Sequence, residues 1–200
     1  MTRILAFDTS LGAPGVAVIE VHKRKPTVID VSHIKTDSKQ PIALRTELVE
    51  SWATLFIAKH VRKGFDVITR EDFHGMSSQQ NYPVFAAWSA TERAVDKFGL
   101  SFDKFVYHTA KGKRKQGHGI SQSRAKALVT GRGNKVSKEE TDTVVRELTG
   151  YVGEFAKDDE SDACCIGLAV LTQLGHILDK HDKLNKYDVE AIQRDTEVIK

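Results

Sequence analysis

The N-terminal part of the chain begins with an apolar run, residues 3–7, that stops at Asp8. Two further extended runs, 16–21 and 27–34, follow after short turns that contain glycine or proline. Strands joined by turns this short pair antiparallel, because the chain has no room to cross over. The sequence therefore predicts that the fold starts with a three-stranded antiparallel meander.

Beyond the meander, strand-like and helix-like patterns alternate. We expect strands over 65–70 and 104–107, and helices over 41–61, 82–98, 121–129, 137–148 and 159–180. Strand–helix units add strands to a sheet and cover it with helices. The prediction is an α/β fold with a mixed five-stranded sheet flanked by helices. It forms one domain over residues 1–180, with a charged tail over 181–200, helical or frayed.

Composition narrows the class of protein. The chain has 200 residues, of which 40% are hydrophobic, enough for a buried core. No apolar stretch approaches the roughly 20 residues of a membrane span, and a strand begins where a signal peptide would lie. Cys164 and Cys165 are adjacent and have no spaced partners for a disulfide framework or a zinc site. We therefore expect buried thiols in a reducing compartment, the cytoplasm.

Positive charge is concentrated in one block. The net charge is only +3, yet residues 111–138 contain nine Lys and Arg and no acid. A basic block interleaved with glycine is typical of a surface that binds polyphosphate. The competing interpretation is a solvated loop that happens to be basic.

Four acids fall at the ends of predicted elements: Asp8, Glu71, Asp159 and Asp162. Asp8 and Glu71 each follow a strand. Asp159 and Asp162 are three residues apart at the start of a helix, on the face that continues into its apolar stripe. Carboxylates gathered without basic partners repel each other, and hard divalent cations relieve that repulsion. The set predicts metal-assisted phosphodiester chemistry.

Each acid also has a simpler explanation. Asp8 could cap an Asx turn, and Glu71 could be a solvent-facing loop acid, with Asp72 able to serve in its place. Asp159 and Asp162 could complement the positive end of their helix. The joint interpretation depends on topology. If the first and fourth strands are parallel neighbours, their ends lie side by side, and a helix packed on that sheet brings its first turn to the same edge.

Three segments in this order, Ile4-Leu5-Ala6-Phe7-Asp8, Val67-Ile68-Thr69-Arg70-Glu71 and Asp159-x-x-Asp162-Ala163, resemble the RuvC family of Holliday junction resolvases. Gly117-His118-Gly119, followed by Ser123-Arg124-Ala125-Lys126, is similar to the basic loop that precedes the third helix of that family. The resemblance covers roughly residues 1–178. It implies a ribonuclease H-like fold.

The resemblance also implies a mechanism and a set of partners. Asp8, Glu71, Asp159 and Asp162 would hold two Mg²⁺ ions, with Mn²⁺ as a substitute, and catalyse paired symmetric nicks in a four-way junction. A homodimer would supply the two active sites. Phe73 would act as an aromatic wedge at the junction, although an aromatic beside a strand end is more often core. The expected phosphate-binding residues are Lys111, Lys113, Arg114, Lys115, Arg124 and Lys126.

The expected dimer element is the helix over 82–98, because its small residues allow a second helix to approach. Those residues are Ala86, Ala87, Ala90 and Ala94. Ordinary packing on the sheet is the competing interpretation.

Two other functions stay open at this level. The first strand also resembles TsaB-type proteins of the actin-like ATPase superfamily, which would make the chain a nucleotide-binding or scaffold protein without nuclease activity. Against this, the basic block and the Asp159-x-x-Asp162 helix start have no role there. A nuclease of the same fold could also cut flaps or Y-forks as well as four-way junctions.

Overall fold

The computed structural model describes residues 1–72, 78–108, 114–133 and 136–184. Within them, one mixed sheet has the strand order β3-β2-β1-β4-β7. Its central strand β1 pairs antiparallel with β2 and parallel with β4. The bounds are β1 (Thr2–Asp8), β2 (Gly15–His22), β3 (Lys25–His33), β4 (Val67–Glu71) and β7 (Gly119–Ile120). The predicted meander and the mixed five-stranded sheet are therefore confirmed.

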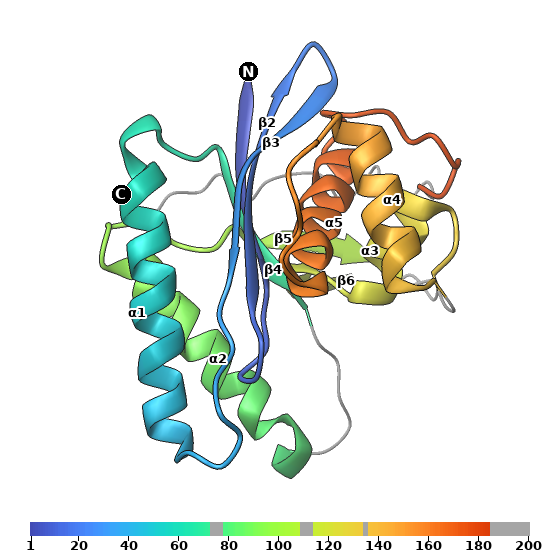
Figure 1. The fold of residues 1–200 in the computed structure, drawn as a ribbon. Coiled ribbons are helices and arrows are strands. Elements are labelled where there is room, and N and C mark those ends of the chain that lie inside the picture. Colours follow the sequence, from blue (N-terminus) through green and yellow to red (C-terminus); the bar gives the residue numbers. More distant parts are fainter. Residues whose placement is uncertain (73–77, 109–113, 134–135, 185–200) are drawn as a thin grey trace.

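Helices cover both faces of this sheet (Figure 1). On one face lie α1 (Ile42–His60), the short 3₁₀ helix Val61–Lys63 and α2 (Ser78–Asp96); on the other lie α3 (Gln122–Thr130), α4 (Lys138–Thr149) and α5 (Asp158–Gln173). Side chains of β1 alternate between the two cores, as a strand requires. Ile4 and Ala6 pack in the α5 layer, and Leu5 and Phe7 pack in the α1–α2 layer.

The strand predicted over 104–107 forms, but it does not join the main sheet. It is β5 (Phe105–His108), which pairs antiparallel with β6 (Arg114–Gly117) in a separate two-stranded ribbon. The fifth place in the sheet belongs to β7, which sequence analysis missed. Gly119 allows this pairing, because a Cβ there would lie 1.5 Å from the Arg70 carbonyl oxygen. With only two residues, β7 is too short to show a period-2 pattern.

The last helix is shorter than predicted. α5 ends at Gln173 instead of residue 180, and Gly175 follows with φ of 71°, a left-handed conformation that glycine adopts without strain. The predicted tail begins with residues 181–184, which are not helical, and Leu184 packs partly against the core. Residues 185–200 lie outside the described part of the chain.

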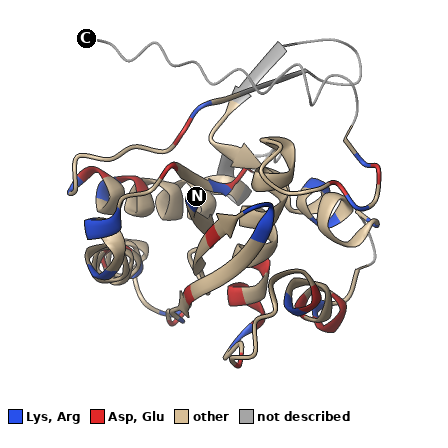
Figure 2. Cartoon of the chain, turned by 90° about the horizontal axis from the view of Figure 1, so that it is seen from above, with Lys and Arg blue, Asp and Glu red and all other residues tan. Residues whose placement is uncertain are grey.

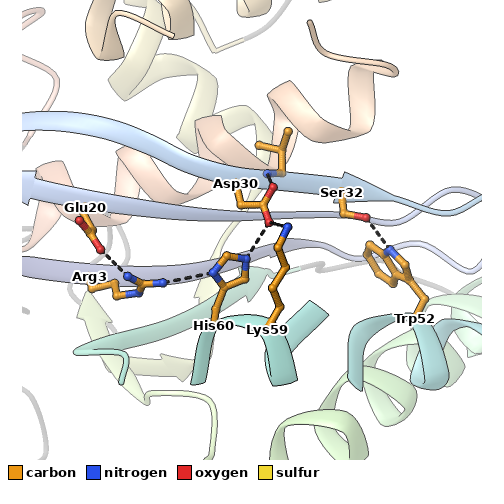
Figure 3. A network of polar contacts seen from close by, with 8 residues as sticks. Arg3, Glu20, Asp30, Ser32, Trp52, Lys59 and His60 are labelled. Atoms are coloured by element: carbon orange, nitrogen blue, oxygen red, sulfur yellow. Dashed lines mark hydrogen bonds and ion pairs between the residues drawn. The ribbon is translucent and has the colours of Figure 1, made fainter. Parts of the chain in front are cut away.

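A network of charged side chains ties α1 to the meander at the end of the sheet where β1 begins (Figure 3). Arg3 is buried and pairs with Glu20 on β2, and its Nη2 lies 3.3 Å from His60 Nδ1. Because a guanidinium can only donate, His60 Nδ1 accepts, and Nε2 is left to donate to Asp30 Oδ2 on β3 at 2.7 Å. Lys59 Nζ contacts the same Asp30 oxygen at 2.6 Å.

Charged residues of both signs are spread along the chain. Viewed from above, Lys and Arg are interspersed with Asp and Glu over both helical layers (Figure 2). Among the described helices, none is long and apolar enough to span a membrane.

Candidate metal and DNA site

Strand register brings Asp8 and Glu71 together. Each is the last residue of its strand, and β1 and β4 are parallel neighbours in which Phe7 pairs with Arg70. Asp8 and Glu71 are therefore adjacent at the same edge of the sheet. Alternation along each strand turns both side chains toward the α5 layer, the side to which Ala6 also points.

The same alternation decides between Glu71 and Asp72. Val67 packs in the α5 layer and Ile68 packs in the α1–α2 layer. By alternation, Glu71 lies on the same side of the sheet as Val67, and Asp72 lies on the same side as Ile68. Asp72 is buried, and its backbone N–H donates to the Ile120 carbonyl at 2.9 Å. Its side chain thus lies on the opposite face of the sheet from Asp8. Glu71 is the acid that joins Asp8.

The first turn of α5 completes the group. Asp159 is half-buried and Asp162 is 6% exposed, and the residues that follow on the helix are fully in the core. Gly15, the cross-strand partner of Asp8, permits this approach. A Cβ on Gly15 would lie 2.0 Å from the Asp159 carbonyl oxygen. The helix start can therefore rest directly over the end of the β1–β2 pair.

Burial and the proximity of like charges raise the pKa of three of these acids. Burial, followed by the charges of Glu71 and Asp162, raises the pKa of Asp8 well above its usual value. Burial is also the largest cause of the raised pKa of Glu71, opposed by a hydrogen bond between the Asp8 and Glu71 carboxyl groups. Burial raises the pKa of Asp159, and the nearby Lys138 charge opposes the shift. Four carboxyl groups thus share one edge of the sheet with too little positive charge to balance them.

Asp162 has partners on α3. Gln122 Nε2 donates to Asp162 Oδ2 at 3.0 Å, and Lys126 Nζ lies 3.2 Å from Asp162 Oδ1. The second contact has the distance of an ion pair but not the geometry of a hydrogen bond. Among the described residues, Oδ1 is a buried oxygen that accepts no hydrogen bond. Such an oxygen can serve as a ligand for a cation.

The residues fit hard divalent cations by their chemistry. All four side chains supply carboxylate oxygens, the ligands that Mg²⁺ and Mn²⁺ prefer. Within the described part of the chain, however, no three His, Cys, Asp or Glu side chains lie close enough together to form a coordination shell. One contact contributes to this, since Asp162 is turned to Gln122 and Lys126.

A second acid at the start of α5 serves the fold instead. Glu160 is 5% exposed, contacts His33 Nδ1 at 2.9 Å and accepts a hydrogen bond from the Ala156 N–H at 2.7 Å. It therefore fastens the loop before α5 to β3. Lys138 on α4 pairs with the exposed Asp158 at 2.8 Å and adds positive charge near the same helix start.

Only some of the residues predicted to bind DNA lie in the described part of the structure. Arg124 Nη2 donates to the Lys183 carbonyl at 2.8 Å, so its side chain contacts the segment that follows α5. Lys126 points to Asp162. Arg114 and Lys115 belong to β6, but their side chains are outside the described part of the structure. Lys111, Lys113 and the predicted wedge Phe73 lie outside the described residues altogether.

The prediction that the alanines of the second helix receive a second copy is wrong. Ala87, Ala90 and Ala94 are fully buried in hydrophobic clusters of the α1–α2 layer. Ala86 is partly buried and packs against the cluster that contains Ala87 and Ala90. The outward side of α2 carries Tyr82 and Phe85 instead, which are 58% and 46% exposed.

Sequence reasoning missed three contributors to this edge: Gly15, Gln122 and the orientation of Lys126. Gln122 and Lys126 are four residues apart, so helical spacing alone puts them on one face of α3. The pattern could have indicated a shared target, although not which one. Gly15 was interpreted only as a turn residue.

A helix-covered mixed sheet with carboxylates at the ends of β1 and β4 and on the first turn of α5 is a ribonuclease H-like fold with a candidate cation site. No protein-family model matches the chain. It is 25% identical over 174 residues to the crossover junction endodeoxyribonuclease RuvC of Synechococcus sp. (strain WH7803), covering 83% of this chain and 96% of that protein.

Two solved structures have the same fold. Thermus thermophilus RuvC superimposes with a TM-score of 0.62 at 17% identity, covering 88% of this chain and 98% of the other. T. thermophilus RuvC in complex with a Holliday junction substrate also has a TM-score of 0.62, at 19% identity. This second match covers 84% of this chain and 92% of the other. The fold is therefore that of RuvC, and the sequence match supports a divergent RuvC-family relationship.

Proposed function

We propose that the chain is a metal-dependent, structure-specific DNA endonuclease that resolves four-way junctions by paired nicks. The observation that carries this proposal is the convergence of Asp8, Glu71, Asp159 and Asp162 at one edge of a RuvC fold. The similarity to curated RuvC over 96% of its length, and to RuvC in complex with a Holliday junction substrate, supports the choice of substrate.

In this proposal the four carboxylates hold two Mg²⁺ ions, which Mn²⁺ can replace. Ions bound there would supply an activated water for attack on the phosphorus and would neutralise charge on the departing oxygen. The protein supplies the four carboxyl groups, which must lose their protons to bind the ions, and a rigid frame for them. β1 and β4 fix Asp8 and Glu71 through backbone pairing, and the start of α5 is fixed by Glu160 and by the close contact at Gly15.

Basic side chains of α3 and of the segment that precedes it in the sequence would hold the DNA backbone. Arg124 and Lys126 come from α3, and Lys111, Lys113, Arg114 and Lys115 precede it in the sequence. Contacts with phosphate position a duplex without reading its sequence, which suits an enzyme that acts on DNA structure. Neutralising Lys113, Arg114 and Lys115 together should weaken junction binding and reduce its dependence on salt.

A homodimer is part of the proposal, because two strands of one junction must be cut symmetrically. The exposed aromatic pair of α2, Tyr82 and Phe85, supports an interface on the outward side of that helix. Exposed aromatics of this size are enriched at protein interfaces. Light scattering of the wild type and of Phe85→Arg would test this, with a dimer expected for the first and a monomer for the second.

The decisive experiment is incubation of the purified protein with a labelled synthetic four-way junction in Mg²⁺ and in EDTA. We expect paired, symmetric nicks that require Mg²⁺, with Y-fork and flap substrates showing how strict the preference is. Binding without cleavage, in both Mg²⁺ and Mn²⁺, would contradict the nuclease assignment.

A further inference from the structure

We propose that Lys126 is an internal counter-ion of the carboxylate site, which holds Asp162 in the metal-free protein and is displaced when a divalent cation binds. The inference rests on the proposed metal site and goes beyond it, because it states how this chain keeps the site folded without metal and what weakens metal binding in the absence of DNA.

The geometry of the pair is the first support. Lys126 Nζ lies 3.2 Å from Asp162 Oδ1, and the two side chains are only 13% and 8% exposed. An ammonium at this depth has lost much of its hydration, so its partner must be an anion for the arrangement to be stable. The partner is one of the four acids proposed to bind metal.

The second support is the state of the oxygen that Lys126 contacts. Asp162 Oδ1 is buried and accepts no hydrogen bond from the described residues. The Lys126 ammonium, 3.2 Å away, therefore supplies the positive charge that this oxygen needs.

The third support is that the backbone holds Lys126 in this position. Its neighbour Ala125 is fully buried, and Leu128 on the next turn is 2% exposed in the core shared with α5. α3 also begins directly after β7, which pairs with the Glu71 strand. Gln122, one turn earlier, binds the other oxygen of Asp162. Both oxygens of this carboxylate are thus contacted from α3.

Competition between the two cations follows. A divalent ion that takes Asp162 Oδ1 as a ligand must displace an ammonium 3.2 Å from the same oxygen. The released Lys126 then needs another anion, and a DNA phosphate at the site would supply it. Metal and DNA should consequently bind with positive coupling, while metal alone binds weakly.

The test is a Mn²⁺ titration of the DNA-free protein, with free Mn²⁺ followed by electron paramagnetic resonance. Lys126→Met keeps the length of the side chain and removes its charge, and we expect it to bind Mn²⁺ about 3- to 10-fold more tightly than the wild type, the range for a partly buried charge. Lys126→Arg should bind like the wild type. Lys138→Met is the matched control, because Lys138 is 60% exposed and pairs with Asp158; we expect a change below about twofold.

Asp162→Asn completes a double-mutant cycle. In that background Lys126→Met should no longer tighten Mn²⁺ binding, because the anion for which the two cations compete is gone. Thermal unfolding in EDTA checks that each variant is folded, and Lys126→Met should melt at a lower temperature than the wild type.

Unchanged or weaker Mn²⁺ binding in folded Lys126→Met would overturn the inference, and so would an equal gain in Lys138→Met. The proposed function fails separately. If Lys126→Met tightens Mn²⁺ binding but the wild type does not nick junctions, the inference about Lys126 is supported and the nuclease assignment is contradicted.

Discussion

The two ends of the central strand handle buried charge in opposite ways. Where β1 begins, Arg3, Glu20, His60, Asp30 and Lys59 form a chain in which each charged group meets an opposite charge or a hydrogen-bonding ring (Figure 3). Where β1 ends, Asp8 lies among Glu71, Asp159 and Asp162 with Lys126 as the cation that contacts one of them.

The pKa shifts of Asp30 and Asp8 have opposite directions. Hydrogen bonds from Lys59 and His60 lower the pKa of Asp30 even though burial opposes the shift. Burial and neighbouring acids raise the pKa of Asp8. A network of opposite charges stabilises a fold, whereas a group of like charges costs stability. The first end fastens α1 to the sheet, and the second carries the carboxylates for which we propose a cation.

The largest expected effect is on catalysis. Asp8→Asn removes one carboxylate from the proposed metal site and should lower junction nicking by about 1000-fold or more while leaving junction binding nearly intact. Single-turnover cleavage and a gel-shift titration measure the two properties. Equal loss of binding and cleavage would mean that Asp8 supports the DNA surface or the fold. The two ends of β1 would then not differ in function as proposed.

Arg3→Met tests the opposite end. It leaves Glu20 and His60 without the buried guanidinium that joins them, and we expect the free energy of unfolding to fall by about 3 kcal/mol. Lys59→Met is the control, since Lys59 is 67% exposed and should change stability by at most about 1 kcal/mol. Urea unfolding measures both. Folded Arg3→Met protein should still nick junctions, and loss of nicking would show that the ends are not independent.

Gly15→Ala tests how α5 reaches the sheet. The added Cβ would meet the Asp159 carbonyl oxygen at 2.0 Å, so the helix start must move. We expect a loss of about 2 kcal/mol in stability and a marked loss of nicking. Gly12→Ala lies in the same turn with nothing closer than 4.0 Å and should be nearly neutral. If both variants behave alike, close packing at Gly15 does not hold the site.

The smallest expected effect is a gain in the stability of the folded protein. Because the folded-state pKa of Asp8 is raised, the folded protein binds this proton more tightly than the unfolded chain does, and stability falls as pH rises from about 4 through the folded-state pKa. In EDTA at neutral pH, Asp8→Asn should therefore be more stable by about 1 kcal/mol, or about 2–4 °C in Tm. The gain should vanish in mild acid. A gain that does not depend on pH would argue against charge repulsion at Asp8.

The sequence was sufficient for what depends on local pattern. The positions of Asp8 and Glu71 at strand ends follow from apolar runs and their stops, and the face shared by Asp159 and Asp162 follows from helical spacing. The choice of Glu71 over Asp72 needed the alternation of β4 against its two cores.

Features that depend on docking between elements could not be predicted. The direction of Lys126 is set by how α3 packs against α5, and the role of Gly15 appears only when a helix start lies over it. Small residues on a helix permit close approach by any neighbour, so the α2 alanines did not distinguish a second copy from the chain's own α1. The two-residue strand β7 depends on the β4 edge to which it pairs.

The most direct test of the central claim is a crystal structure of the protein grown with Mn²⁺, with the ions located by their anomalous scattering. The account predicts anomalous peaks bound by Asp8, Glu71, Asp159 and Asp162, with the Lys126 ammonium moved away from Asp162. A structure at saturating Mn²⁺ with no peak among these carboxylates, and with Lys126 still on Asp162, would contradict it.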